Sequence, residues 1–438
     1  MTESLIGFAA LLALIFLRVP IAFAMALVGA VGFALLRSWS ATWSMVGTVA
    51  FETSLSYTLS VVPLFILMGN LLTISGVSHG LYAAANSVLG RVRGGLAMAS
   101  VVACGAFSAV CGSSLATAAT MSKVAMPSMR RYGYADSLAT GSIAAGGTLG
   151  ILIPPSVVLI VYGLLTESDI GKLFIAGVIP GVLGVVFYMA AVAVVVRLQP
   201  DAAPRSAGVE PFSSRERIGV LAVGGLFVLI MTGIYGGFFT PTEAAGVGAG
   251  AAFLITVFVG GAGAAQLFQA CVETARTTAM IFAIIMGAEI FSNFINFAGL
   301  PEGLASWVAG LDASAYLVMA GIVGIYLILG CVMESLSMIL LTVPVFAPLM
   351  YELDFGAGVL QDSEAAVIWF GIIVVVVTEI SLITPPVGLN VFVLRSVLPD
   401  VPLSTIFRGV VPFWIADIAR LLLLLALPIL SLWLVGWM

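Results

Sequence analysis

Hydrophobic residues in this chain of 438 residues fill whole stretches instead of alternating with polar ones. Runs such as 5–17, 21–36, 61–74 and 421–438 are apolar on every side. They are too long for strands, and they suit helices surrounded by lipid and by other helices. Ten-residue segments of alternating polarity are absent, which argues against an outer-membrane barrel. The pattern therefore predicts a series of transmembrane helices.

The second half of the chain repeats the pattern of the first half. The displacement is 221 residues at first and drifts to 231 and 232 later. Two similar halves in an apolar chain are typical of a transporter. The matched pairs are Val19-Pro20 with Thr240-Pro241, 124–129 with 345–350, Ser114-Leu115 with Ser335-Leu336, 153–155 with 384–386, and 177–180 with 409–412.

Composition places the chain in a membrane. Hydrophobic residues make up 61% and charged residues 8%, with a mean hydropathy of +1.21, and a water-soluble core cannot hide that much apolar surface. The first apolar run has no basic segment or cleavage site before it, so we expect a retained helix. No GxxxxGK[ST] run is present, which argues against ATP hydrolysis, and the single histidine, His79, argues against a zinc site or a histidine proton relay.

The charges that flank two apolar blocks predict opposite orientations. The block 94–129 lies between two pairs of arginines, whereas the block 313–350 has only acidic residues nearby. Because Lys and Arg favour the cytoplasmic side, the ends of the first block are expected inside and those of the second outside. A block of about 36 residues whose ends share one side is best built as a helical hairpin that enters the membrane and turns back.

We therefore predict an all-α polytopic membrane protein with two inverted-topology repeats, about ten transmembrane helices and two re-entrant hairpins. Both termini are expected outside. The first repeat is 1–197, with its hairpin at about 94–129 and a broken helix at about 137–165. A polar cytoplasmic linker, 198–217, precedes the second repeat, 218–438, with its hairpin at about 313–350 and a broken helix at about 367–393. The ten expected spans are 5–17, 21–36, 55–77, 137–165, 173–196, 218–236, 242–260, 277–298, 367–393 and 405–437.

Each repeat contains a double proline within an expected span. Pro154-Pro155 follows a glycine-rich segment, and Pro385-Pro386 precedes Gly388. Paired prolines remove two backbone donors, so the helix is expected to break there. At membrane depth the freed carbonyls are tolerated only in a protein interior or in a wet cavity, where they can coordinate a small cation. Two ordinary proline kinks are the alternative, which the matched positions disfavour.

The expected turns of the two hairpins are rich in small hydroxyl residues. They are 111–117 (CGSSLAT) and 333–337 (MESLS). A cage of carbonyl and hydroxyl oxygens with little formal charge favours a monovalent hard cation, whereas Ca²⁺ usually takes several carboxylates. Sodium is the natural candidate. Close packing of helices through small residues is the alternative, and either turn taken alone leaves both interpretations open.

Together these motifs resemble the large membrane subunit of TRAP transporters, the tripartite ATP-independent periplasmic family. The similarity covers essentially the whole chain. It rests on GSSLATA at 112–118, MPSM at 126–129 with RYGY at 131–134, GTLGILIPPS at 147–156, FTPTEAA at 239–245 and ITPPVGLN at 383–390.

The resemblance implies a fold and a function. It implies an elevator-type fold of the ion-transporter superfamily and a sodium-coupled importer, not an enzyme, in the bacterial inner membrane. The implied substrates are small organic acids such as C4-dicarboxylates or sialic acids, and Na⁺ is the coupling ion, with no other cofactor. The implied partners are a small four-helix membrane subunit and a periplasmic substrate-binding protein. Because no such subunit precedes Met1, we expect the small subunit to be a separate chain.

The resemblance also implies roles for individual residues. Glu334 departs from its counterpart Ser113, so the two cation sites need not be equivalent. The first sodium site would use Gly112, Ser113, Ser114, Gly150, Ile153 and Pro155, the second Ser335, Thr384, Pro385 and Gly388, and the substrate-binding candidates are Thr117, Ser156 and Asn390.

Several charged residues and functions stay open at this stage. Carboxylates within or beside apolar spans are functional candidates, except that Glu243, just after Pro241, is expected to cap a helix. A proton-coupled or stand-alone organic-anion transporter, with Glu379 as the essential carboxylate, is the runner-up, and a channel or assembly component is the alternative class. The sequence does not name the substrate. The other charged candidates are Glu289, Glu334, Lys123, Arg276 and Arg395.

Overall fold

The structure is a computed structural model that describes residues 2–204, 212–310, 313–331, 333–356 and 358–437, apart from the side chains of residues 215 and 309. Regular structure in these ranges is entirely helical. Six of the helices are long and apolar enough to cross a membrane, or seven if one bent pair counts as a single span. An all-helical, polytopic membrane protein is thereby confirmed.

The first half of the chain forms ten α-helices. Two of the junctions between them are short 3₁₀ turns, η1 (Thr58–Ser60) and η2 (Leu149–Ile151). The helices are α1 (Thr2–Phe16), α2 (Ile21–Leu36), α3 (Trp39–Leu55), α4 (Val61–Ile74), α5 (Val77–Leu89), α6 (Gly95–Cys111), α7 (Ser114–Arg131), α8 (Asp136–Thr148), α9 (Val157–Thr166) and α10 (Ile170–Leu198).

The second half follows a short 3₁₀ turn, η3 (Pro200–Ala202). Of the expected linker, residues 205–211 lie outside the described residues. The elements are α11 (Ser214–Tyr235), α12 (Pro241–Phe258), α13 (Ala264–Phe297), α14 (Leu300–Gly310), α15 (Ala315–Gly330), α16 (Ser335–Phe346), η4 (Pro348–Tyr351), α17 (Ser363–Ile383), α18 (Leu389–Val397), α19 (Leu403–Ala426), α20 (Ile429–Leu432) and η5 (Val435–Trp437).

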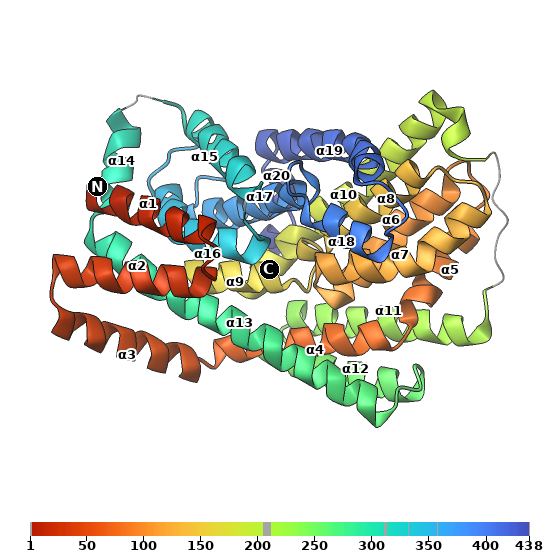
Figure 1. Ribbon diagram of the computed structural model, residues 1–438, viewed down its shortest axis with the longest axis horizontal. Helices are drawn as coiled ribbons and strands as arrows, with labels where there is room; N and C mark the ends of the chain where they lie inside the picture. Colours follow the sequence, from red (N-terminus) through yellow and green to blue (C-terminus); the bar gives the residue numbers. More distant parts are fainter. Residues whose placement is uncertain (1, 205–211, 311–312, 332, 357, 438) are drawn as a thin grey trace.

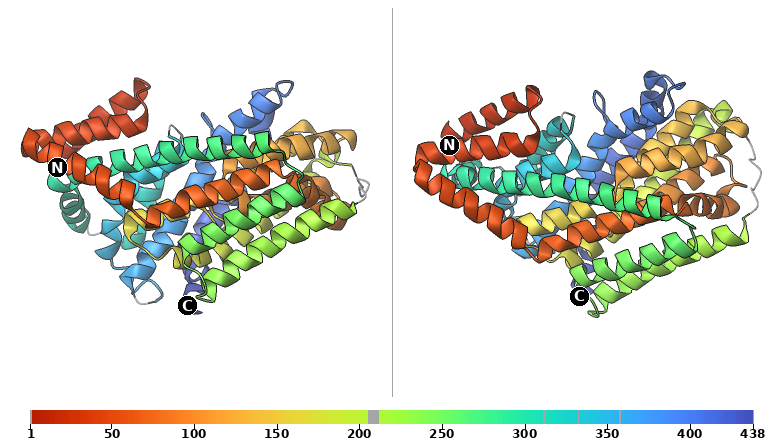
Figure 2. Two further views of the ribbon diagram at one scale, coloured as in Figure 1. Left: turned by 90° about the horizontal axis from the view of Figure 1, so that it is seen from below. Right: turned by 60° about the horizontal axis from the view of Figure 1, so that its bottom comes forward.

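One layer of the molecule consists of the long helices α2, α3, α4, α11, α12 and α13. They run side by side along the lower part of Figure 1, and both views of Figure 2 show them as one layer of neighbouring helices. Small residues let their backbones approach closely. A Cβ at Gly29 of α2, for example, would lie only 2.7 Å from backbone atoms of Ile290 and Phe291 on α13. We call this layer the outer layer.

A second layer, the inner layer, contains α6–α10 and α15–α19. Its two helical hairpins lie in opposite halves of Figure 1, α6 and α7 on the right and α15 and α16 on the left. Helix α17 runs through the middle, and its residues from Ala366 to Ile383 are all buried. Hydrogen bonds anchor it on both sides, because Tyr162 Oη of α9 donates to the carbonyl of Val367 (2.6 Å) and Trp369 Nε1 donates to that of Leu424 in α19 (3.1 Å).

Three expected spans differ from the helices observed. Helix α13 begins at Ala264, well before the expected start at 277. The expectation followed hydrophobicity, but the first turns of α13 carry polar side chains that stay exposed, such as Gln269, which donates to Glu273 (3.1 Å). The expected span 405–437 ends at Ala426, since Pro428 follows and cannot continue the helix.

The third difference concerns the expected span 55–77. Only 61–74 of it forms α4, and the sequence reasoning missed the neighbouring helices α3 and α5. Helix α3 meets the segment 58–74 at a bend of 57°. Both missed helices are less apolar than their neighbours, with Ser, Thr and Glu52 in α3 and Ser, Asn and His79 in α5, so hydrophobicity alone did not reveal them.

Candidate functional site

The turn of the first hairpin lies at Gly112 and Ser113, between α6 and α7. Gly112 has a positive φ of 64° and ends α6, a backbone conformation that glycine adopts without steric cost. Ser113 caps α7 by accepting a hydrogen bond from the backbone N–H of Ala116 (3.4 Å). The chain thus reverses at a point where two helix ends meet and backbone groups lack helical partners.

The first helix break separates α8 from α9. Residues 152–156 are not helical, Gly150 lies in η2, and the Pro154-Pro155 peptide bond is cis. Ser156 joins both sides of the break: its hydroxyl donates to the carbonyl of Ile151 and accepts from the N–H of Leu159 (3.2 Å). Its hydrogen-bonding capacity is therefore largely used within the protein.

The turn of the second hairpin lies between α15 and α16. Ser335 is the first residue of α16 and is buried, and Glu334 precedes it as the N-cap residue. Ser337 donates to the carboxylate of Glu334 (3.2 Å). The hydroxyls of Ser335 and of Ser114 in the first hairpin form no hydrogen bond within the part of the chain that the structure describes. Both are therefore available to a ligand.

The second helix break separates α17 from α18 and includes the cis Pro385-Pro386 bond. Thr384 ends α17, and its hydroxyl donates to the carbonyl of Ile380 (2.6 Å) and accepts from Nε1 of Trp414 on α19 (3.0 Å). Gly388 starts α18 with a φ of 46°. The two breaks differ in burial, because Pro154 and Pro155 are buried whereas Pro385 and Pro386 are exposed.

Each hairpin turn lies beside the break of its own half of the chain. The carbonyl oxygen of Pro155 is 3.6 Å from the position that a Cβ on Gly112 would occupy. In the second half, Sγ of Cys331 donates to the carbonyl oxygen of Pro385 (3.7 Å). The structure therefore brings the two segments of each predicted sodium site together, with carbonyl and hydroxyl oxygens as their polar groups.

One cavity of about 240 Å³ lies between the two hairpin turns. Gly112, Ser113 and Ser114 line it from the first hairpin, and Glu334 and Ser335 from the second. The outer layer contributes Ile66 and Asn70 of α4 and Thr277, Met280 and Ile281 of α13. Its volume suits a ligand smaller than a typical drug molecule. No lysine or arginine is among the described residues that line the cavity.

The three residues predicted to bind substrate are not among those that line the cavity. Thr117 is buried within the first hairpin, where its hydroxyl accepts from Ser108 (3.1 Å). Asn390 of α18 is buried and donates from Nδ2 to the carbonyl of Ala144 on α8 (3.0 Å). Ser156 caps α9. All three connect segments of the inner layer, and sequence reasoning could not separate this role from ligand contact because both place polar side chains next to a break.

Comparison with known proteins decides the family. The family model described as "Tripartite ATP-independent periplasmic transporter, DctM component" matches residues 8–430. The chain belongs to this family. The resemblance of the sequence motifs to TRAP transporters is thereby confirmed.

Two relatives illustrate the range of the TRAP family. The C4-dicarboxylate TRAP transporter large permease protein DctM of Pseudomonas aeruginosa is 38% identical over 392 residues, which is 89% of this chain and 88% of that protein. The sialic acid TRAP transporter large permease protein SiaM of Vibrio cholerae is 30% identical over 423 residues, 95% of each chain. Membership therefore places the chain among multi-pass transport permeases.

A solved structure shares the fold. The YdaH transporter of Alcanivorax borkumensis superimposes with a TM-score of 0.61 over 90% of each chain, at 15% sequence identity. At this identity the similarity concerns the fold alone. It shows that the arrangement of helices in this TRAP permease occurs in another transporter.

The remaining charged candidates fall into different environments. Glu243 caps α12, because it accepts from the backbone N–H and the hydroxyl of Thr240 (2.8 and 2.9 Å), which confirms the predicted cap. Lys123 and Arg276 are exposed. Arg395 donates to the carbonyls of Pro399 and Val401. Glu289 is half-buried and lines a second cavity, of about 230 Å³, with Glu52.

Sequence reasoning missed a buried cluster of polar groups behind the breaks. Glu379 pairs with Arg420 of α19, which in turn lies beside Asp417, and Oδ2 of Asp417 lies 2.6 Å from Oη of Tyr188 on α10. A signal was present, because Asp417 and Arg420 are spaced three residues apart inside an otherwise apolar run. Their partners lie far away in the sequence, so only the three-dimensional structure reveals the cluster.

Proposed function

We propose that the chain is the translocating subunit of a sodium-coupled importer of small organic acids. The substrate class would be carboxylates such as C4-dicarboxylates or sialic-acid-like sugar acids, in line with the relatives described above. The observation that carries the proposal is the shared cavity. Turns from both halves of the chain line it, and no basic side chain is among its described lining residues.

Charge explains why this cavity favours co-transport with a cation. An organic anion that enters it meets the carboxylate of Glu334 and no lysine or arginine among the described residues that line it. Burying like charges together without compensation is costly. Cations bound beside the cavity would supply the missing positive charge, so substrate and cation binding would favour each other.

The donor groups suit sodium. The first site would be formed by Gly112, Ser113, Ser114, Gly150, Ile153 and Pro155, and the second by Ser335, Thr384, Pro385 and Gly388. Their polar groups are hydroxyls and carbonyls, and the described residues contain no group of three or more His, Cys, Asp or Glu side chains placed to hold a metal ion. An oxygen-only set with little formal charge suits a monovalent hard cation better than Zn²⁺ or Ca²⁺.

The arrangement of layers supports an elevator mechanism within an inverted-repeat fold. The two hairpins lie in opposite halves of the molecule (Figure 1), and the turns of both line the cavity. The inner layer holds both hairpins and both breaks, whereas α4 and α13 of the outer layer contribute one wall of the cavity. Movement of the inner layer against the outer layer would expose the cavity to either side in turn, which is the alternating access that repeat-based transporters use.

The proposal includes the partners and the location. A small membrane subunit and a periplasmic substrate-binding protein would complete the transporter in the bacterial inner membrane. The isethionate TRAP transporter permease protein DctMQ of Oleidesulfovibrio alaskensis is 31% identical over 395 residues, and the matched part makes up 60% of that longer protein.

Thermal stability in detergent tests the sodium sites. The melting temperature of the purified protein is measured against NaCl and KCl at matched ionic strength, for wild type, Ser114→Ala and Ser335→Ala, with Ser396→Ala on the exposed side of α18 as the control. A ligand that binds only the folded state stabilises it by RT ln(1 + [L]/Kd), about 2.7 kcal/mol at a hundredfold excess over Kd. We expect saturable stabilisation by Na⁺ alone, weakened in the first two variants.

Two results would count against the proposal. Equal curves in both salts, with the small subunit also present, would rule out sodium as the coupling ion. Equal sodium responses in wild type, Ser114→Ala and Ser335→Ala would place the cation elsewhere. Uptake into proteoliposomes with both partners, under a sodium gradient or a proton gradient, then compares a C4-dicarboxylate with sialic acid and decides between sodium and proton coupling.

A further inference from the structure

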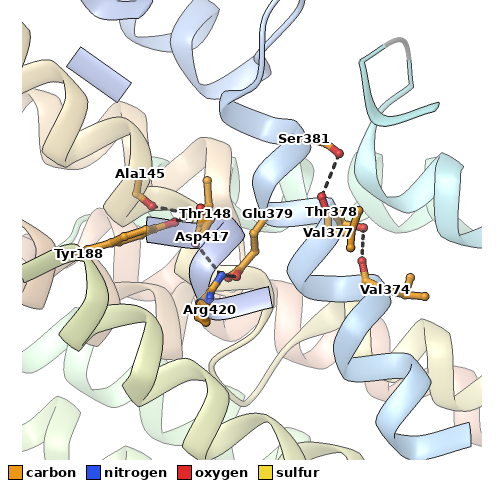
Figure 3. Close-up of polar contacts among 10 residues, drawn as sticks. All are labelled: Ala145, Thr148, Tyr188, Val374, Val377, Thr378, Glu379, Ser381, Asp417 and Arg420. Atoms are coloured by element: carbon orange, nitrogen blue, oxygen red, sulfur yellow. Dashed lines mark hydrogen bonds and ion pairs between the residues drawn. The ribbon is translucent and has the colours of Figure 1, made fainter. Parts of the chain in front are cut away.

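Five polar side chains form a buried cluster within the inner layer (Figure 3). They come from four helices: Thr148 ends α8, Tyr188 lies on α10, Glu379 on α17, and Asp417 and Arg420 on α19. The exposed fraction of every one of them is 0%. Burying three ionisable carboxyl and guanidinium groups without contact to water demands internal compensation of their charge.

The cluster is a continuous series of contacts. Thr148 Oγ1 lies 3.1 Å from Tyr188 Oη, which lies 2.6 Å from Asp417 Oδ2. Nη2 of Arg420 lies 2.9 Å from Asp417 Oδ1, outside hydrogen-bonding geometry, and forms a hydrogen-bonded ion pair with Oε2 of Glu379. Gly184 makes room for the guanidinium, because a Cβ there would overlap Nη1 of Arg420. The series connects the helix before the first break to the helix before the second.

The cluster follows the internal repeat. Glu379 comes 231 residues after Thr148, the displacement that relates the two double prolines, and Arg420 comes 232 residues after Tyr188, the displacement that relates 177–180 to 409–412. The contact of Thr148 with Tyr188 and the contact of Glu379 with Arg420 are therefore counterparts. The counterpart of Asp417 is the apolar Val185, so Asp417 is the one charged group of the cluster that lies outside these two matched contacts.

The charges of the cluster do not cancel if both carboxyl groups are ionised. Two carboxylates and one guanidinium leave a net charge of −1. Other charged groups on the helices packed against α19 lie at the ends of those helices: Asp136 pairs with Arg130, Lys172 with Glu364, Arg395 with backbone carbonyls, and Arg197, like Arg408 on α19 itself, is exposed. One bound proton would make the cluster neutral.

Counting hydrogens places that proton on Asp417. Three oxygen pairs follow one another: the carbonyl of Ala145 and Thr148 Oγ1 (2.8 Å), Thr148 Oγ1 and Tyr188 Oη, and Tyr188 Oη and Asp417 Oδ2. Each hydrogen bond needs one hydrogen, and two hydroxyls supply only two. A protonated Asp417 supplies the third: Asp417 donates to Tyr188, Tyr188 to Thr148, and Thr148 to Ala145.

The other carboxyl group is a poorer place for the proton. Oε2 of Glu379 is engaged by Arg420, and Oε1 has no hydrogen-bond partner within the described chain. A proton on Oε1 would be a buried donor without an acceptor, which is unfavourable because the group has lost its hydration and gained no partner. Charge and hydrogen counts therefore agree on a neutral Asp417 beside an ionised pair of Glu379 and Arg420.

We propose that Asp417 is a buried proton-binding site whose proton saturates the hydrogen-bond series that ends at the first break. Loss of the proton leaves one oxygen pair of the series without a hydrogen and gives the cluster its net negative charge. Thr148 lies two residues before Gly150. The contacts from Asp417 through Tyr188 to Thr148 therefore connect the protonation of Asp417 to the geometry of the first break. The site lies outside the two sodium sites, and its assignment does not depend on them.

Isotope-edited infrared spectroscopy of the wild-type protein tests the assignment. A protonated carboxyl group has a C=O stretching band that an ionised one lacks, and carbon-13 aspartate shifts this band only if an aspartate carries the proton. The other described aspartates are exposed or are paired with an arginine at the surface, so none of them has the buried environment of Asp417. We expect a band at neutral pH that shifts with labelled aspartate. Absence of the band, or a band whose frequency does not change with labelled aspartate, would overturn the proposal.

Variants assign the band to the residue without relying on transport. We expect the aspartate band to disappear in Asp417→Asn. In Tyr188→Phe, which removes the acceptor, the band should move to the higher frequency of a free acid, whereas Tyr316→Phe at an exposed position should leave it unchanged. An aspartate band that persists in Asp417→Asn, or that does not move in Tyr188→Phe, contradicts the assignment. The sodium titration uses separate samples, so failure of the sodium proposal leaves this result intact.

Discussion

Replacement of Arg420 by glutamine should be among the most destabilising single changes in the inner layer. The guanidinium is fully buried and is the only basic group that contacts Glu379 and Asp417 among the described residues. Its removal leaves the carboxylate of Glu379 buried without a counter-charge. Breaking a buried ion pair from one side costs about 3–5 kcal/mol, because the remaining charge has already lost its hydration.

The free energy of unfolding in mixed detergent micelles, followed by tryptophan fluorescence during titration with a denaturing detergent, measures this cost. Arg408→Gln is the matched control, because it removes an exposed arginine from the same helix and should change stability little. The double variant Glu379→Gln with Arg420→Gln removes both charges. It should be more stable than Arg420→Gln alone, with a coupling energy of about 2 kcal/mol or more.

Two results would refute this reasoning. If Arg420→Gln cost no more than Arg408→Gln, the ion pair would carry no net stabilisation. If the double variant were as unstable as the sum of the two single variants, the loss would come from packing around the long side chain and not from an uncompensated charge. A single variant that does not fold, together with a double variant that does, would support the account.

Three further predictions concern packing, sodium and pH. Gly141→Ala should destabilise the protein by about 1–3 kcal/mol in the same unfolding assay, because its Cβ would overlap the carbonyl of Gly409 where α8 crosses α19, whereas Gly224→Ala, with open space around it, should not. Trp414→Phe removes the donor that orients the Thr384 hydroxyl and should shift sodium-dependent melting to higher sodium concentrations. The exposed Trp433→Phe is the control and should leave the sodium titration unchanged. An unchanged titration in Trp414→Phe as well would contradict the role of Thr384. Arg130 donates to Asp400 (2.6 Å) and holds the pKa of that carboxyl below its ordinary value, so the ion pair stabilises the protein fully above the ordinary pKa and loses this effect as the pH falls through the lowered pKa. The melting temperature of wild type should lie slightly above that of Asp400→Asn at neutral pH and should equal it in strong acid. A difference in melting temperature that grows on acidification would be inconsistent with this.

The local signals in the sequence were sufficient for several elements. Pro241 with Glu243 three residues after Thr240 predicts a capped helix start, and the structure confirms it in α12. Glycine, hydroxyl residues and double prolines act on the backbone within a few residues, so the positions where α6, α8, α15 and α17 end follow patterns that can be read directly.

Features that depend on distant parts of the chain were not predictable. Asn70 of α4 and Thr277 of α13 line the cavity between the hairpin turns, but nothing in their neighbourhoods marks them as different from other polar residues in helices. Glu379 was recognised as an unusual membrane carboxylate, yet its partner Arg420 lies 41 residues away, and Tyr188 lies 229 residues before Asp417. Pairings over such distances follow from tertiary packing.

The early start of α13 shows that hydrophobicity alone does not locate the ends of a helix. Its first turns bear Gln266, Gln269 and Glu273, which a search for apolar runs treats as the end of a span. These side chains need no burial because they stay on the exposed side, and a helix continues wherever its backbone bonds are satisfied. The sequence therefore predicts where apolar surface is needed better than where helices begin.

Equilibrium binding of radioactive sodium to the purified protein, measured by a scintillation proximity assay with potassium at constant ionic strength, tests the central claim most directly. The account predicts saturable binding at two sites, with one site lost in Ser114→Ala and the other in Ser335→Ala. No saturable sodium binding, or binding that both variants leave unchanged, would contradict sodium sites at the two hairpin turns.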